Sequence, residues 1–159
     1  MIDIHQQEDT VMFKFKGTHL EAAQLRKKFM TQLSSYAIHK VTFLKNKTAF
    51  TYEDLAYRFG LLIVDYASDK IGSLNFKGPG MLYCHHIKGI TFIHDSPITY
   101  LNENEHLKCD LFVEEGTGKQ HGKWNPVAAI RFMEVDNYFQ FKFELTGQLP
   151  LDEMIKQLK

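Results

Sequence analysis

The clearest strand pattern in this 159-residue chain is Tyr138-Phe139-Gln140-Phe141-Lys142-Phe143-Glu144-Leu145. Three phenylalanines and a leucine alternate with Tyr and polar side chains, which is the period of a strand with one buried face. A single strand cannot bury such a face by itself. The segment therefore predicts a sheet that is covered on its phenylalanine side.

The residues after this strand predict a short terminal helix. Gly147 and Pro150 end the strand, and the apolar side chains that follow share one helical face: Leu151, Met154, Ile155 and Leu158. The helix is only about nine residues long, whereas an isolated helix needs roughly 12–15 residues to be marginally stable in water. Its apolar face must therefore rest on another element.

A second strand and helix are predicted near the amino terminus. Val11, Phe13 and Phe15 alternate with lysines up to Gly17, and Thr18-His19-Leu20-Glu21 has the form of a capping box. The helix is expected over about 18–33, with an apolar stripe of Ala22, Leu25, Phe29 and Leu33 that is widened by Leu20, Ala23 and Met30. The chain's own sheet or a partner chain could cover these helical faces, and the pattern leaves both open.

The middle of the chain predicts further short elements. Strands or extended segments are expected at 38–44, 61–64, 89–94, 107–113 and 127–135, and a helix at 52–59 that ends at Gly60. The segment 68–80 is rich in Gly, Ser, Asn and Lys, so we expect a loop and a sub-domain boundary there. Together these elements predict an α+β fold.

The composition excludes several classes of protein. Nineteen Lys and Arg balance nineteen Asp and Glu, whereas a protein that holds nucleic acid mainly by charge normally has a basic excess. Residues 1–10 are polar, and the longest apolar stretch, 59–64, is far below the roughly 20 residues of a membrane span. We expect a soluble, intracellular protein with no signal peptide. Two cysteines do not make a secreted disulfide framework.

No enzyme motif is complete in the chain. Gly116-Thr117-Gly118-Lys119 lacks the first glycine of a phosphate-binding loop, because that position is Val113, and Gln120 stands where Ser or Thr is needed. There is no G-x-S-x-G elbow, no H-E-x-x-H and no acidic pair that regular geometry brings together. We expect no catalytic residues in this chain.

A zinc site is the other chemistry that the residue types allow. Cys84-His85-His86 and His106-Leu107-Lys108-Cys109 could together supply two cysteine and two histidine ligands. His106 and Cys109, however, straddle the start of the predicted strand 107–113, where an offset of three residues points them to opposite faces. We therefore expect Cys109 to be a buried apolar residue and no metal or cofactor in this chain.

Two stretches of the sequence resemble one family. The first is Leu25-Arg26-Lys27 with Asn46-Lys47-Thr48 and the run from Glu53 to Leu62; the second is Gly116-Thr117-Gly118-Lys119-Gln120-His121-Gly122-Lys123-Trp124-Asn125-Pro126-Val127-Ala128-Ala129. They resemble the α-like assembly subunits of multisubunit DNA-directed RNA polymerases, which include an archaeal member, the third subunit of eukaryotic polymerase II and the bacterial α amino-terminal domain. The second stretch matches the family loop G-x-G-K-x-H-A-K-W-x-P-V-A-A almost position for position.

This resemblance implies a scaffold subunit built from two parts. A dimerisation sub-domain, an antiparallel sheet with helices, would consist of 1–66 and 136–159, and a β-rich insert of 67–135 would interrupt it. Family members pair with a smaller α-like subunit, and the pair assembles the largest and second-largest subunits, with small zinc-binding subunits as further neighbours. The catalytic Mg²⁺ belongs to the largest subunit, and no direct DNA or membrane contact is expected of this chain.

The resemblance also assigns candidate interface residues. The heterodimer surface would include Ala22, Leu25, Arg26, Phe29 and Leu33 of the first helix and Leu151, Met154, Ile155 and Leu158 of the last. Docking to the large subunits would use Lys27, Glu53, Arg58, Lys119, His121, Lys123 and Trp124, because cationic and aromatic side chains are favoured anchors.

The chain departs from the family at several points. Lys27 replaces the second arginine of the first helix, Tyr57 replaces a histidine, and the usual proline after Leu62 is Ile63. There is no cysteine-rich cluster in the insert. These departures suggest a compact polymerase, such as a viral one, in the nucleus, the cytoplasm or a virion. The alternative is a stand-alone binding module, in which Lys119 to Trp124 hold an anion or a single-stranded nucleic acid.

Overall fold

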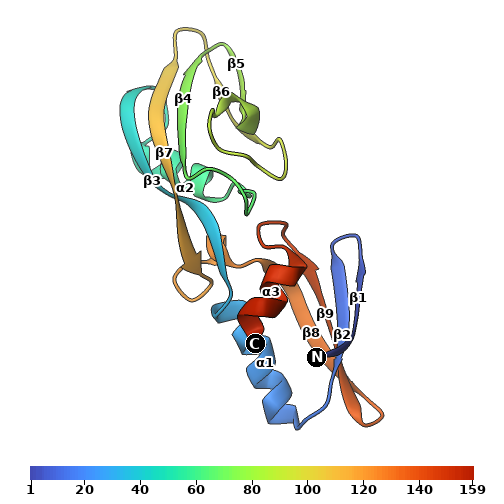
Figure 1. Cartoon of the computed structure of the whole chain (residues 1–159). Helices are drawn as coiled ribbons and strands as arrows, with labels where there is room; N and C mark the ends of the chain where they lie inside the picture. Colours follow the sequence, from blue (N-terminus) through green and yellow to red (C-terminus); the bar gives the residue numbers. More distant parts are fainter. The chain divides into compact units, whose positions relative to one another are not determined.

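The computed structural model describes residues 1–159 and divides into two compact units (Figure 1). Unit one consists of 1–35 and 116–159, and unit two of 36–115. The division falls within two long strands, β3 (Ser34–Lys47) and β7 (His106–Thr117). The expected division into a dimerisation sub-domain of 1–66 and 136–159 and an insert of 67–135, which the family resemblance implies, stays a prediction.

Unit one contains a four-stranded antiparallel sheet in the order β1-β2-β9-β8. The strands are β1 (Ile2–Gln7), β2 (Thr10–Phe15), β8 (Val127–Val135) and β9 (Tyr138–Leu145). β9 coincides with the strand predicted from the alternating phenylalanines. Val11 pairs with Phe143, Phe13 with Phe141 and Phe15 with Phe139, so one face of the central pair is almost entirely aromatic.

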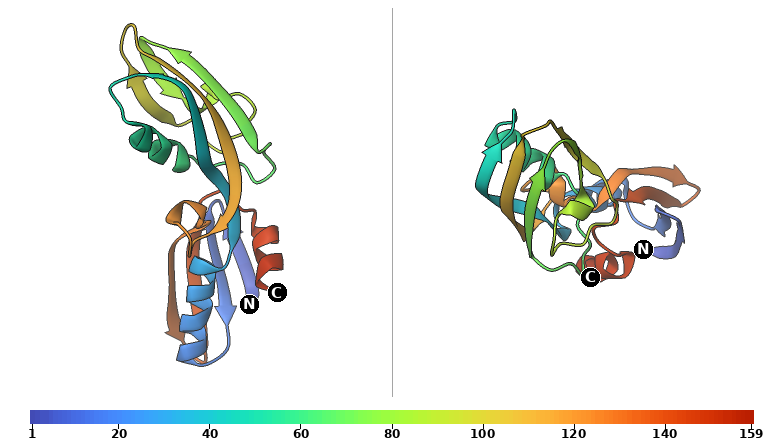
Figure 2. Two further views of the ribbon diagram at one scale, coloured as in Figure 1. Left: turned by 90° about the vertical axis from the view of Figure 1, so that its left-hand side faces the viewer. Right: turned by 90° about the horizontal axis from the view of Figure 1, so that it is seen from above.

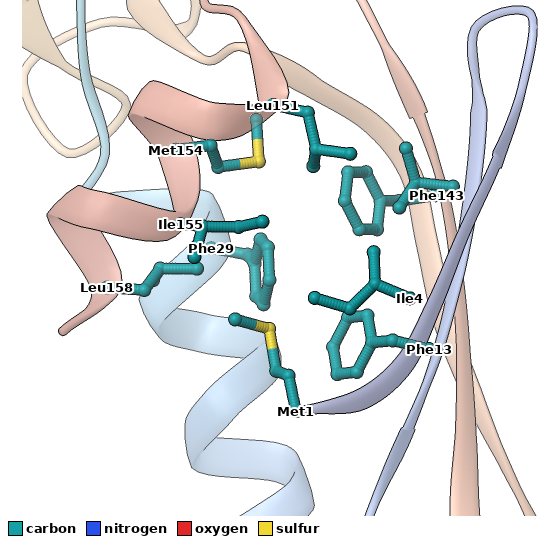
Figure 3. Close-up of a pocket in the computed structure, with 10 residues that line it drawn as sticks. Met1, Ile4, Phe13, Phe29, Phe143, Leu151, Met154, Ile155 and Leu158 are labelled. Atoms are coloured by element: carbon teal, nitrogen blue, oxygen red, sulfur yellow. The ribbon is translucent and has the colours of Figure 1, made fainter.

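Two helices cover this aromatic face. α1 (His19–Thr31) begins with the predicted capping box, in which the Thr18 hydroxyl accepts from the Glu21 amide and the Glu21 carboxylate accepts from the Thr18 amide. α3 (Leu151–Leu158) carries the predicted apolar stripe. Figure 3 shows side chains from both helices directed towards Phe13 and Phe143 of the sheet. The chain's own sheet therefore supports the short terminal helix.

The packing between helices and sheet leaves almost no space. The rings of Phe29 and Phe143 lie 5.1 Å apart, and those of Phe13 and Phe141 are stacked at 4.8 Å. The cavity between α1, α3 and the sheet measures about 10 Å³ and has an apolar lining. It is too small and too apolar for a ligand, so this region is a core.

Unit two contains a sheet in the order β3-β7-β4, with β4 (Ile71–Lys77) antiparallel to β7, and a hairpin of β5 (Gly80–Tyr83) and β6 (Pro97–Leu101). Figure 2 shows β3 and β7 running side by side. α2 (Tyr52–Gly60) places Leu55 and Phe59 in the core, and a 3₁₀ turn, η1 (Cys84–His86), follows β5. The α+β class is confirmed.

Several local predictions for unit two are wrong. The segment 68–80 contains β4 instead of a loop, because Gly72, Leu74 and Phe76 form an inward face that pairing with β7 stabilises. The expected strand at 89–94 makes only an isolated bridge, from Phe92 to Val64, and the segment 61–64, expected as a strand or an extended segment, contributes Val64 to that bridge. The sequence pattern also does not predict β5 and β6, or β1 of unit one, a polar edge strand that pairs with β2 alone.

Candidate partner-binding surfaces

The glycine-rich loop between β7 and β8 is packed tightly against the rest of unit one. Gly116 lies against the ring of Trp124, and Gly118 lies against the main-chain carbonyl of Met30 at the end of α1. A Cβ atom at either position would overlap these atoms. Both positions therefore require glycine, because neighbouring atoms approach the main chain too closely for a side chain. Trp124 is buried, with only 4% of its surface exposed.

A buried polar network holds the same loop. The Ser35 hydroxyl donates to the Trp124 carbonyl at 2.6 Å, and the Gln148 amide donates to Ser35 Oγ at 2.7 Å and to the Lys123 carbonyl at 2.9 Å. Ser35 and Gln148 are 0% and 2% exposed. Sequence reasoning missed both residues. The sequence offered two weak signals. Ser35 alternates with the apolar residues Leu33 and Ala37, and Gln148 stands between Gly147 and Leu149.

The outer part of the loop carries the exposed groups. Lys119 and His121 are exposed, and the 3₁₀ turn η2 (Gly122–Trp124) begins where His121 Nδ1 accepts from the Lys123 amide at 3.0 Å. Lys123 Nζ lies 4.7 Å from the Trp124 ring centre. Since that ring is buried, it cannot stack on a nucleic-acid base, and this removes the main support for the stand-alone binding module.

The predicted heterodimer residues of α1 lie mostly on its core side. Ala22, Phe29 and Leu33 are buried and Leu25 is partly buried. Arg26 is exposed, and its Nε donates to the Ile130 carbonyl of β8 at 3.1 Å. The outward side of α1 consists of Leu20, Ala23, Lys27 and Met30, in which Leu20 is 67% exposed. We call these four residues the outer face of α1.

The predicted residues of α3 point into the same core. Met154 is buried, and Leu151, Ile155 and Leu158 are partly buried around the small cavity (Figure 3). Gln157 fixes the helix to the start of β3, since it accepts from the Ser34 amide at 2.8 Å and donates to the Ser34 carbonyl at 3.1 Å. The structure thus brings the α1 and α3 residues together, as core packing within one chain.

Glu53 and Arg58 belong to unit two, on α2. Arg58 forms an ion pair with Asp54 at 3.4 Å, donates to the Ile98 carbonyl at 3.2 Å and lies over the Phe50 ring. Glu53 is exposed, Tyr57 one turn later is 59% exposed, and Leu61, the C-cap residue of α2, is 49% exposed. We call Glu53, Tyr57 and Leu61 the outer face of α2.

The candidate zinc ligands do not form a cluster. No group of three or more His, Cys, Asp or Glu side chains is placed to hold a metal ion. Cys84 and Cys109 are buried free thiols, and burial followed by the charge of Asp110 raises the pKa of Cys109 to about 12. His85 Nδ1 instead pairs with Asp95 at 2.9 Å, which lowers the pKa of that carboxyl group.

Curated relatives of the chain share one name. It is 26% identical over 142 residues to the DNA-directed RNA polymerase subunit Rpo3 of Pyrococcus furiosus, covering 77% of this chain and 54% of that protein. It is 24% identical over 154 residues to Rpo3 of Methanocaldococcus jannaschii, covering 92% and 81%. Rpo3 of Thermococcus kodakarensis is 25% identical over 142 residues, covering 77% and 55%.

These relatives confirm the resemblance to archaeal α-like subunits. No family model matches the chain. The chain spans about half the length of the Pyrococcus and Thermococcus relatives and about four fifths of the Methanocaldococcus one. No helix of the structure is both long and apolar enough to span a bilayer.

Proposed function

We propose that this chain is a non-catalytic assembly subunit of a DNA-directed RNA polymerase, which pairs with a smaller α-like subunit and docks the two large catalytic subunits. The observation that carries the proposal is the similarity to proteins named RNA polymerase subunit Rpo3 along 77–92% of the chain. The catalytic Mg²⁺ would belong to the largest subunit. Small zinc-binding subunits would be further neighbours, and this chain would hold no cofactor itself.

The heterodimer surface proposed here is centred on the outer face of α1. Leu25, Phe29 and the α3 stripe already pack in this chain's core, whereas Leu20, Ala23 and Met30 present apolar area with Lys27 between them. A helix with apolar residues on two sides is typical of one that packs on its own sheet and on a second helix layer. Arg26, at the margin of this face, adds a charge.

Docking to the large subunits is proposed for two further surfaces. The first is the outer part of the glycine-rich loop, with Lys119, His121 and Lys123, which the buried Trp124 holds in place from below. The second is the outer face of α2, where an exposed tyrosine and leucine stand beside Glu53. Partly exposed aromatic residues ringed by charge are common at protein interfaces.

The proposal is tested by purifying the tagged chain from its native source at moderate salt and identifying bound proteins by mass spectrometry. We expect two large polymerase subunits and a small α-like chain. The same experiment with a Tyr57→Ala, Lys119→Ala double variant should keep the small chain and lose large subunits. Recovery of the wild-type chain alone would contradict the assembly role.

A further inference from the structure

Four lysines gather at one end of the β3-β7-β4 sheet in unit two. Lys45 and Lys47 lie at the end of β3, Lys77 at the end of β4, and Lys108 near the start of β7. All four are exposed, and none has an ion-pair partner. In a chain with no net charge, this end of the sheet therefore concentrates positive charge.

Three of the four lysines line a groove of about 440 Å³. Lys45, Lys47 and Lys77 line it together with the turn that leads into β7. Two acidic residues of that turn, Glu103 and Glu105, also line it. The Glu105 carboxylate accepts from the Ala49 amide at 2.9 Å and the Asn102 amide at 2.6 Å. Glu105 thus fixes the turn while it keeps its charge, so three lysines and two carboxylates line the groove and its net charge is positive.

His106 reports the local potential. Its Nε2 lies 2.5 Å from Asn75 Oδ1. Desolvation, and then the charges of the four lysines, lower the pKa of this histidine. A positive potential at the mouth of a groove favours a ligand that brings several negative charges.

We propose that this groove binds the phosphate groups of a nucleic-acid strand. Lysines act on phosphates as point charges, without the fixed geometry that a bidentate contact needs. The groove offers no Phe, Tyr, Trp, Leu, Ile or Met side chain as an anchor, and its least polar lining residues are Pro79 and His106. An acidic protein segment would need such an apolar centre for a stable interface, whereas a local cluster of lysines can hold a phosphate backbone by charge. The charge balance of the whole chain and the family resemblance predict no direct DNA contact, and this local cluster departs from both.

The test is fluorescence anisotropy of the full chain with a fluorescein-labelled DNA single strand of about 20 nucleotides and the matching duplex, over a range of salt concentrations. The test variant is Lys45→Gln/Lys47→Gln/Lys77→Gln. The control variant, Lys16→Gln/Lys88→Gln/Lys159→Gln, removes the same charge from exposed lysines outside the groove. We expect the test variant to bind at least tenfold more weakly at low salt, and the control to bind within about twofold of wild type.

Salt dependence adds a second readout. Loss of three phosphate contacts should reduce the slope of log K against log[salt] by roughly 2–3, since each contact contributes about 0.7–0.9. The pKa of His106, followed by NMR, should rise when the strand binds, because phosphates offset the lysine charges. Equal weakening of test and control variants, or no rise at His106, would overturn the proposal.

Two competitors separate the possible sources of negative charge. Tripolyphosphate should displace the strand only at much higher concentration, because it spans less of the groove. Tighter binding of polyglutamate than of the strand would overturn nucleic acid in favour of an acidic protein segment. The proposal does not rest on the polymerase role: its failure leaves the purified assembly unchanged, and failure of that assembly leaves strand binding unchanged.

Discussion

Gly118 shows most clearly how a single residue shapes the candidate docking loop. Its Cα faces the Met30 carbonyl so closely that a side chain has no room, whereas nothing lies within 4 Å of an added Cβ at Gly122 in the same loop. The residues that carry the family resemblance in this loop therefore differ in role: some pack the loop and others are exposed. Gly116, Gly118 and Trp124 build the loop, while Lys119 and His121 face outwards.

Gly118→Ala is accordingly expected to destabilise the chain by about 1–3 kcal/mol, the usual cost of forcing extra volume into a packed site. Thermal unfolding followed by circular dichroism measures the effect. Gly122→Ala is the matched control and should change stability by less than about 0.5 kcal/mol. Equal effects of the two substitutions would show that the loop does not pack against α1 as described.

The terminal helix gives a prediction at the scale of an element. Met154 is fully buried between α3 and the sheet, so Met154→Ala should reduce the free energy of unfolding of the isolated chain by about 2–5 kcal/mol. Asp152→Ala, on the exposed side of α3, is the control. If the isolated chain is insensitive to Met154→Ala, then α3 is not docked until a partner arrives.

The outer face of α1 gives a second prediction for an element. Leu20→Asp should weaken pairing with the α-like subunit by about 2 kcal/mol or more, because an unpaired charge would be buried in the interface. Leu20 is already exposed in the chain alone, so the melting temperature should not change. Leu44→Asp, at another exposed leucine, is the control in the same co-purification. Full recovery of the small subunit with Leu20→Asp would exclude this face.

The elements that the sequence predicts well are those whose pattern and end signals agree. β9, β2, α1 and α2 each combine a clear period with a cap or a glycine stop. β4 escapes prediction because its inward side includes Gly72, and its stability comes from pairing with β7, which is distant in sequence. The glycine-rich loop between β7 and β8 could be located by its motif. The burial of Trp124 could not, because the main chain of its turn is held by Ser35 and Gln148, which come from distant segments.

At the scale of the whole molecule, stability should depend on pH through two histidines. Burial, followed by neighbouring positive groups, lowers the pKa of His86 and His106 from 6.5. The unfolded chain therefore takes up protons first as pH falls below about 6.5, and stability decreases from there down to the folded-state pKa values. We expect a lower melting temperature at about pH 5 than at about pH 7.5.

The contribution of each histidine can be separated by substitution. In the wild type the Tyr83 amide donates to His86 Nδ1, and His86→Asn keeps an acceptor there. His106→Gln keeps a polar side chain beside Asn75. The double variant should lose part of the decrease in melting temperature between about pH 7.5 and about pH 5. An unchanged decrease would assign the pH effect to other groups.

The free edge of β8 has a consequence for how this chain behaves in isolation. An exposed strand edge is a template on which further copies can add, as in amyloid growth. Here the register shifts between Ala128 and Arg131, and two successive carbonyls are occupied: Ala129 accepts from Arg131 and Ile130 accepts from Arg26. The irregular register bends the strand here, and arginine side chains bond two of its carbonyls, so this part of the edge offers no regular ladder to another strand. We expect the isolated chain to resist polymerisation along this edge.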